Sequence, residues 1–111
     1  IGYHEWEGLS VDTDESLRIA ENMGNNKCLI MRNHGFLTVG ETAGESFMNM
    51  HYLVRACANM LQVCATGLPL AETSPEMWEK AAQQYAAFVP GKYEWPALLR
   101  QVDRIDPSYK Y

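Results

Sequence analysis

The sequence predicts an α/β fold class that needs more chain, or a partner, to close its core. Three observations lead to this prediction: short apolar segments near the start, one long uninterrupted helical stretch, and two further helical patterns toward the end. A strand that is apolar on both faces needs neighbouring strands for its backbone hydrogen bonds as well as for its side chains. Because only two or three strands are predicted, we expect either a fragment of a larger fold or an obligate oligomer whose partner completes the sheet.

Three short segments are predicted to be strands. Residues 2–8 are aromatic and end in glycine, which is typical of a strand that runs into a loop. The run Cys28–Met31 is apolar throughout and too short for a typical helix, so it indicates a central strand covered on both faces. Asn33, His34 and Gly35 interrupt the run, and residues 36–40 resume it as a second extended segment.

Two helices are predicted to begin at capping boxes, in which a polar side chain and a glutamate three residues later bond to each other's backbone N–H groups. Asp12 with Glu15 begins a weakly amphipathic helix that ends at Gly24. Thr42 with Glu45 begins a helix of about 24 residues that ends at residues 66–67. Apolar side chains cover this second helix so widely that we expect it to be buried on most of its circumference.

Two shorter helices are predicted after it. Ser74 followed by Pro75 has the cap-then-proline order of a helix start, and the apolar pattern continues to residue 88. The last helix is predicted from about residue 95 to residue 105, followed by a polar, aromatic tail.

Composition excludes several classes of protein. The 111 residues carry a net charge of −5, which argues against nucleic acid as a partner because phosphates would be repelled. No apolar run approaches the roughly 20 residues of a membrane span, and the first residues do not resemble a signal peptide, so we expect a soluble, cytoplasmic protein. The three cysteines form no Cys-x-x-Cys pair and lie in apolar runs, which indicates reduced, buried side chains.

His34, at the end of a predicted buried strand, is the strongest candidate for chemistry. A rigid strand end beside a glycine is a frequent place for site residues, and imidazole is a good ligand for zinc and similar ions. A catalytic zinc takes three protein ligands, however, so His34 alone makes no site, and an ordinary turn histidine is the alternative. Of the other histidines, His51 fits a partly buried, hydrogen-bonded side chain on the long helix, and His4 has no assigned role.

The remaining polar residues give weaker signals. Glu5 and Glu7 flank Trp6 and share one face of an extended segment, so they could act as acid and base, but two solvated surface acids are the favoured interpretation. The capping glutamates already have structural roles, and the cysteines of the long helix lack neighbours that would activate a thiol. No phosphate-binding glycine loop, nucleophile elbow or nucleotide motif is present. We therefore assign no catalytic residue, and the substrate-binding residues stay unknown.

The string from Leu29 to Gly40, Leu-Ile-Met-Arg-Asn-His-Gly-Phe-Leu-Thr-Val-Gly, resembles the class II aldolase/adducin family, as does the long helix that follows. Tyr-His-Glu-Trp-Glu-Gly at 3–8 and Trp-Pro-Ala-Leu-Leu-Arg at 95–100 are also similar to adducin-like members of that family. The resemblance covers essentially the whole chain. Its most specific part is the Arg-Asn-His-Gly block at 32–35 with its spacing to Gly40.

The resemblance implies a three-layer α/β/α domain of roughly twice this length, with a mainly antiparallel central sheet, C-terminal helices and assembly as a homo-oligomer, usually a tetramer. On this basis residues 1–72 are the C-terminal half of the domain and residues 73–111 are its helical extension. Family enzymes hold a divalent metal, commonly zinc, between a His-x-His pair from the first half and a histidine that matches His34. The acid/base carboxylate also comes from the first half, and no His-x-His is present in this sequence.

Three functions stay open at this stage. The first is part of a metal-dependent aldolase-like carbon–carbon lyase, or a related epimerase, acting on a small hydroxylated or phosphorylated carbonyl compound such as a sugar. The metal is then held only in the complete domain, and this chain by itself is inactive. The second is a non-enzymatic, adducin-like module for oligomerisation and cytoskeletal association. The third is a degenerate copy that binds nothing.

Overall fold

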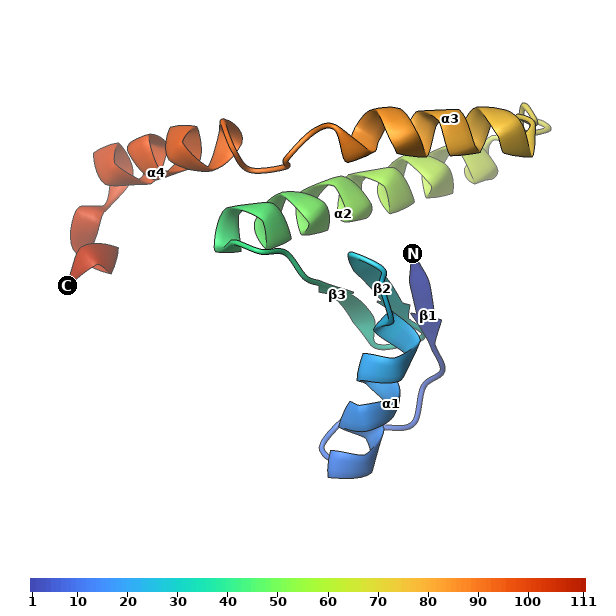
Figure 1. Ribbon diagram of the computed structural model, residues 1–111, viewed down its shortest axis with the longest axis horizontal. Helices are drawn as coiled ribbons and strands as arrows, with labels where there is room; N and C mark the ends of the chain where they lie inside the picture. Colours follow the sequence, from blue (N-terminus) through green and yellow to red (C-terminus); the bar gives the residue numbers. More distant parts are fainter.

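A computed structural model describes residues 1–111. Three strands and one helix precede the long helix, and the other helices follow it (Figure 1). The elements are β1 (Gly2–His4), α1 (Thr13–Met23), β2 (Cys28–Met31), β3 (Gly35–Thr38), α2 (Ala43–Ala65), α3 (Pro75–Ala86), α4 (Glu94–Ile105) and the 3₁₀ turn η1 (Pro107–Lys110). All predicted strands and helices are present. They could be predicted because local glycine, proline or capping signals mark their ends.

The three strands form one sheet in the order β1-β2-β3. β1 pairs with β2 in parallel, and β2 pairs with β3 in antiparallel orientation. The sheet of this chain is therefore mixed, whereas the family resemblance implied a mainly antiparallel one. The reason is α1, a helical crossover that returns the chain to the start of the sheet and so makes β1 and β2 parallel.

The core lies between α1 and the sheet. It consists of Met23, Leu29 and Met31, with Ile19 packed against it, and Leu29 has no exposed surface. α2 packs on the opposite side, against β2 and β3, so that the small sheet lies between α1 and α2 in Figure 1. β2 is therefore covered on both faces, as predicted.

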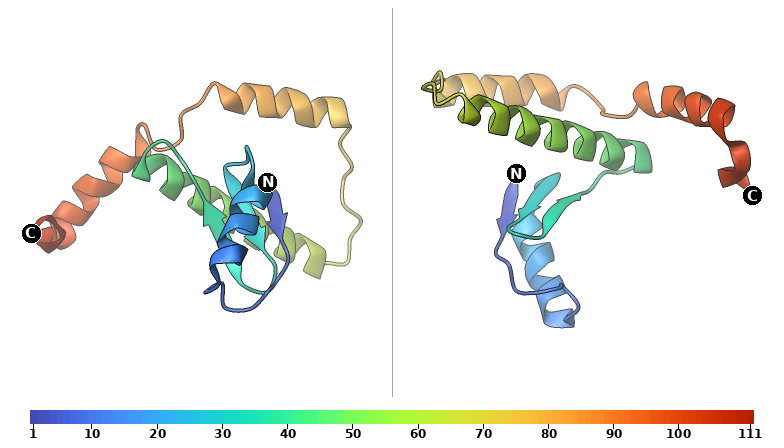
Figure 2. Two further views of the ribbon diagram at one scale, coloured as in Figure 1. Left: turned by 60° about the horizontal axis from the view of Figure 1, so that its bottom comes forward. Right: turned by 180° about the vertical axis from the view of Figure 1, so that it is seen from behind.

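The expected burial of α2 on most of its circumference is wrong for this chain. Only Gly44, Glu45, Met48 and Leu53 are buried, and all of them lie in the first half of the helix. The second half extends past the sheet, where side chains such as Leu61 stay exposed. The backbone of α3 does not approach that of another element closely, and the left view of Figure 2 shows its ribbon apart from that of α2.

The three cysteines are less buried than predicted. Cys28 and Cys57 are half-buried, whereas Cys64 near the end of α2 is exposed, and all three are free thiols. Burial raises the pKa of the Cys28 thiol.

No helix of the structure is both long enough and apolar enough to pass through a lipid bilayer.

The two predicted capping boxes have different outcomes. At α2, Thr42 Oγ1 accepts a hydrogen bond from the Glu45 N–H at 3.1 Å, and the Glu45 carboxylate accepts one from the Glu41 N–H at 2.8 Å. This box is confirmed, with its return bond shifted by one residue. At α1 the Asp12 side chain forms no cap, so that box is wrong. Glu15 instead points into the protein.

Acid is expected to weaken the attachment of α2 through Glu45. The Glu41 N–H and the Lys27 ammonium, 3.2 Å from the carboxylate, hold the pKa of Glu45 below its ordinary value of 4.5. The stabilisation is therefore complete above pH 4.5 and is lost as the pH falls through the lower folded-state pKa. In the wild-type protein this change in the free energy of unfolding should be about one kcal/mol, the size of a typical helix cap. Glu45→Gln should remove it from unfolding curves measured between pH 3 and pH 6. Glu72→Gln, an exposed change on the same chain, is the control.

Candidate functional site

His34 lies in the tight turn between β2 and β3. Met31 and Gly35 face each other across the two strands, and the His34 N–H donates to the Met31 carbonyl at 3.1 Å. Asn33 has φ 55° and Gly35 has φ 156°, both in a region that L side chains seldom adopt. The hydrogen bond and the two special conformations fix the backbone on each side of His34.

The imidazole of His34 is exposed and forms no hydrogen bond or ion pair within the chain. The turn therefore has a rigid backbone and a side chain whose two nitrogens are available. This placement is the one predicted from the sequence, although the role of His34 as a metal ligand stays a prediction.

The loop that follows β1 runs beside this turn. His4 is opposite Met31 in the parallel pairing of β1 and β2, so the residues after both strands meet at the same edge of the sheet. The Arg32 N–H donates to the His4 carbonyl at 2.9 Å, and Arg32 Nη1 lies 3.2 Å from Glu5 Oε1. The start of the histidine turn is thus tied to the end of β1.

Glu5 and Glu7 are both exposed and each pairs with a different arginine. Glu5 pairs with Arg32, and Glu7 receives two bonds of 3.0 Å from Arg18 Nε and a further one from its Nη2. The Arg18 guanidinium lowers the pKa of Glu7 and so keeps this carboxylate charged. The interpretation of the two residues as surface acids is confirmed.

A polar cluster built around two buried side chains lies between β1 and α1, and sequence reasoning missed it. We call it the His4 cluster; its members are His4, Ser10, Glu15 and Asn22. His4 Nε2 lies 3.4 Å from Glu15 Oε1, which also accepts from Ser10 Oγ at 2.9 Å. Asn22 Nδ2 lies 2.9 Å from His4 Nδ1. His4 and Glu15 are only 2% and 3% exposed.

The signal that could have revealed this cluster is the alternation of β1. Gly2 and His4 face inward while Tyr3 faces out, so His4 stands at a core position of the strand. A histidine there needs polar partners, and an acidic residue in the first turn of the following helix can supply one.

No residues of this chain complete a metal site around His34. Nowhere do three His, Cys, Asp or Glu side chains lie close enough together to hold a metal ion. His51 is exposed on α2 and makes an edge contact with the Tyr52 ring, so its expected partial burial and hydrogen bond are wrong. His34 has the chemistry of one zinc ligand, and any further ligands must come from outside these residues.

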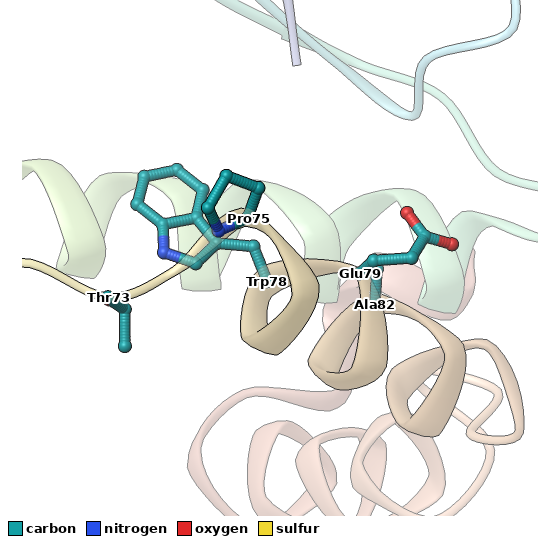
Figure 3. A pocket seen from close by; sticks show the side chains of 5 residues that line it. All are labelled: Thr73, Pro75, Trp78, Glu79 and Ala82. Carbon is teal, nitrogen blue, oxygen red and sulfur yellow. The ribbon is translucent and has the colours of Figure 1, made fainter.

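The hollows of the surface lie elsewhere. One is formed at the start of α3 by Thr73, Pro75, Trp78, Glu79 and Ala82, and Figure 3 shows the Glu79 carboxylate directed away from the Trp78 indole. A second adjoins it across Trp78 and includes Met60. Each hollow contains a single potential metal ligand, Glu79 in the first and Glu72 in the second, which is too few to hold a metal ion.

The fold and the turn together define a class: an α/β chain that presents one exposed histidine at the edge of a mixed sheet. The comparisons identify the family within that class. The family described as "Class II Aldolase and Adducin N-terminal domain" matches residues 1–61. The chain belongs to the class II aldolase/adducin family.

Individual relatives match almost the whole chain. A putative aldolase class 2 protein of Caulobacter vibrioides is 34% identical over 98% of this chain and 44% of its own length. Alpha-adducin of Rattus norvegicus is 30% identical over 95% of this chain and 16% of its own length. The crystal structure of an aldolase II superfamily protein from Pseudomonas syringae aligns with a TM-score of 0.81 at 29% identity, over 99% of this chain and 45% of that one. The chain therefore spans less than half the length of these relatives.

Proposed function

We propose that this chain contributes His34 as one of three protein ligands to a divalent metal, with zinc the expected ion. The activity proposed for the complete protein is that of an aldolase-like carbon–carbon lyase, or a related epimerase, on a small hydroxylated or phosphorylated carbonyl compound. The observation that carries this proposal is the exposed, unpartnered imidazole on a turn whose backbone is fixed on both sides. Family membership and the similarity to a putative aldolase support it.

A divalent metal at such a site supplies Lewis acidity, which stabilises the negative charge that develops on a substrate oxygen when a neighbouring carbon–carbon bond breaks. His34 would bind the metal through a neutral ring nitrogen. The turn would hold the backbone at His34 in place, so that little backbone conformational entropy is lost on binding. The other ligands, the acid/base group and the substrate-recognising residues are proposed to lie outside residues 1–111.

The proposed assembly follows from the exposed apolar surface. In this proposal residues 1–72 are the later half of a three-layer domain and residues 73–111 are its helical extension. The exposed apolar side chains of α2 and α3, among them Leu61, Trp78 and Tyr85, would be covered in a cytoplasmic homo-oligomer, a tetramer by family resemblance. The three free cysteines suit a reducing compartment.

The alternative is an adducin-like module without catalysis, which assembles with itself and with the cytoskeleton. The similarity to alpha-adducin across most of the chain supports it. Both proposals use the same fold, and they differ in whether His34 binds a metal ion.

The test is a metal titration and a cleavage assay on the polypeptide as the cell makes it. The enzyme proposal expects one tightly bound Zn²⁺ per subunit and cleavage of some members of a panel of hydroxylated and phosphorylated carbonyl compounds, abolished by a chelator and restored by Zn²⁺. A protein that binds no divalent metal, turns over none of the panel and still assembles into oligomers would support the adducin-like alternative instead.

A further inference from the structure

The His4 cluster joins four polar side chains that no proposed chemistry uses, and two of them, His4 and Glu15, are buried. Burying polar groups is costly unless each has a partner, and here every buried side-chain nitrogen and oxygen has one. Ser10 also holds φ 55°, a conformation that residues other than glycine and asparagine seldom adopt. The loop after β1 thus keeps a strained residue in the position that places its hydroxyl 2.9 Å from Glu15.

The hydrogen bonds of the cluster form one connected set. With the Asn22 amide nitrogen donating to His4 Nδ1, the His4 proton is on Nε2 and is directed to Glu15 Oε1. The same carboxylate oxygen accepts from Ser10. Three segments are joined in this way: the last residue of β1, the loop after it, and two turns of α1.

The cluster is connected to His34 through the backbone of β1. The carbonyl of His4 accepts from the Arg32 N–H at 2.9 Å, while its side chain is held on the other side by α1. Glu5, the next residue, pairs with the Arg32 guanidinium at 3.2 Å. Arg32 stands two residues before His34, at the start of the turn. Any shift of the end of β1 therefore moves the segment that holds His34.

We propose that the His4 cluster positions the His34 turn, with Glu15 and Asn22 as positioning residues that act through His4 and Arg32. This inference rests on the proposed role of His34 as a metal ligand. It adds that the affinity of the site depends on residues of α1 that do not touch the metal.

Hydrogen exchange of the metal-free, natural polypeptide tests the structural part. Glu15→Leu, which leaves the His4 and Ser10 donors without an acceptor, is expected to speed exchange of the Arg32 and His34 amides at least tenfold. The Ser46 amide in α2, which donates to Thr42, should exchange at an unchanged rate. Glu15→Gln keeps an acceptor oxygen and should restore most of the protection. Equal acceleration of all three amides, or no acceleration, would overturn the proposal.

Asn22→Ala provides a second variant in case Glu15→Leu does not fold. Asn22 is exposed apart from its contact with His4, so the fold should survive, and the same two amides should lose protection by a smaller factor. Glu7→Gln is the matched control. It breaks an exposed ion pair between the same loop and α1 without touching the His4 cluster, and it should leave the Arg32 and His34 amides unchanged.

A Zn²⁺ titration of the same proteins tests the functional part. Glu15→Leu should weaken Zn²⁺ binding roughly tenfold, the lower end of the range for residues that orient a metal ligand, and Asn22→Ala should weaken it by a smaller factor. Wild-type affinity in a variant with lost amide protection would overturn the positioning role. Absence of Zn²⁺ binding in the wild-type protein would instead refute the proposed function, and the exchange rates would still decide whether the cluster holds the turn.

Discussion

Replacing His34 by alanine in the natural polypeptide is expected to weaken Zn²⁺ binding about 100-fold. A zinc site with four protein ligands binds with roughly 10–16 kcal/mol, so one ligand is worth about 3 kcal/mol, which corresponds to that factor. Isothermal titration with Zn²⁺ after complete chelation measures the change. The metal-free stability should stay within about 0.5 kcal/mol of wild type, because the imidazole is exposed and contacts nothing that folding needs.

His51→Ala is the matched control for this experiment. His51 is likewise exposed, but it lies on α2 and its only ring contact is with Tyr52. Its replacement should leave Zn²⁺ affinity unchanged. Undiminished binding in His34→Ala would place the metal on other ligands and contradict the assignment made from the Arg-Asn-His-Gly block.

The elements of this fold were predictable because each is encoded by local signals. Glycine and proline bound the helices, the run Cys28–Met31 is apolar throughout, and the turn at His34 follows from Asn33 and Gly35. The same local signals also placed His34 correctly, at the exposed end of a strand. Residue types and spacing carry this information without any knowledge of the tertiary structure.

The His4 cluster was not predictable in the same way. Asp12 and Glu15 have the spacing of a capping box, but no such box forms. Glu15 instead forms hydrogen bonds with His4 and Ser10, which the local spacing does not reveal. The burial of α2 failed for a related reason. An apolar pattern shows which faces can be buried, whereas the chain itself supplies only part of the surface that would cover Leu61.

The packing of α4 on α2 depends on two glycines, and Gly91→Ala is expected to release it. A Cβ on Gly91 would lie 2.4 Å from the carbonyl carbon of Gly44 and 2.5 Å from its oxygen. Gly44 in turn lies under Trp95, whose ring packs against the Phe47 ring in a tilted arrangement with the centroids 5.5 Å apart. The backbone of α2 cannot yield to the new methyl without displacing Trp95. Gly91 also has φ 84°, so alanine adds conformational strain to the clash.

The expected loss is about 2–5 kcal/mol in the free energy that holds α4 on α2, the sum of overpacking and left-handed strain. Protection of the α4 amides from hydrogen exchange measures this loss. Gly67→Ala measures the strain alone, in the protection of the last turn of α2, since Gly67 has φ 68° but no atom within 4 Å of the added Cβ, and it should cost only about 1–2 kcal/mol there. Equal losses in the two variants would mean that strain alone is responsible. The close approach of Gly91 to Gly44 would then not be what joins the C-terminal helices to the His34-bearing part of the chain.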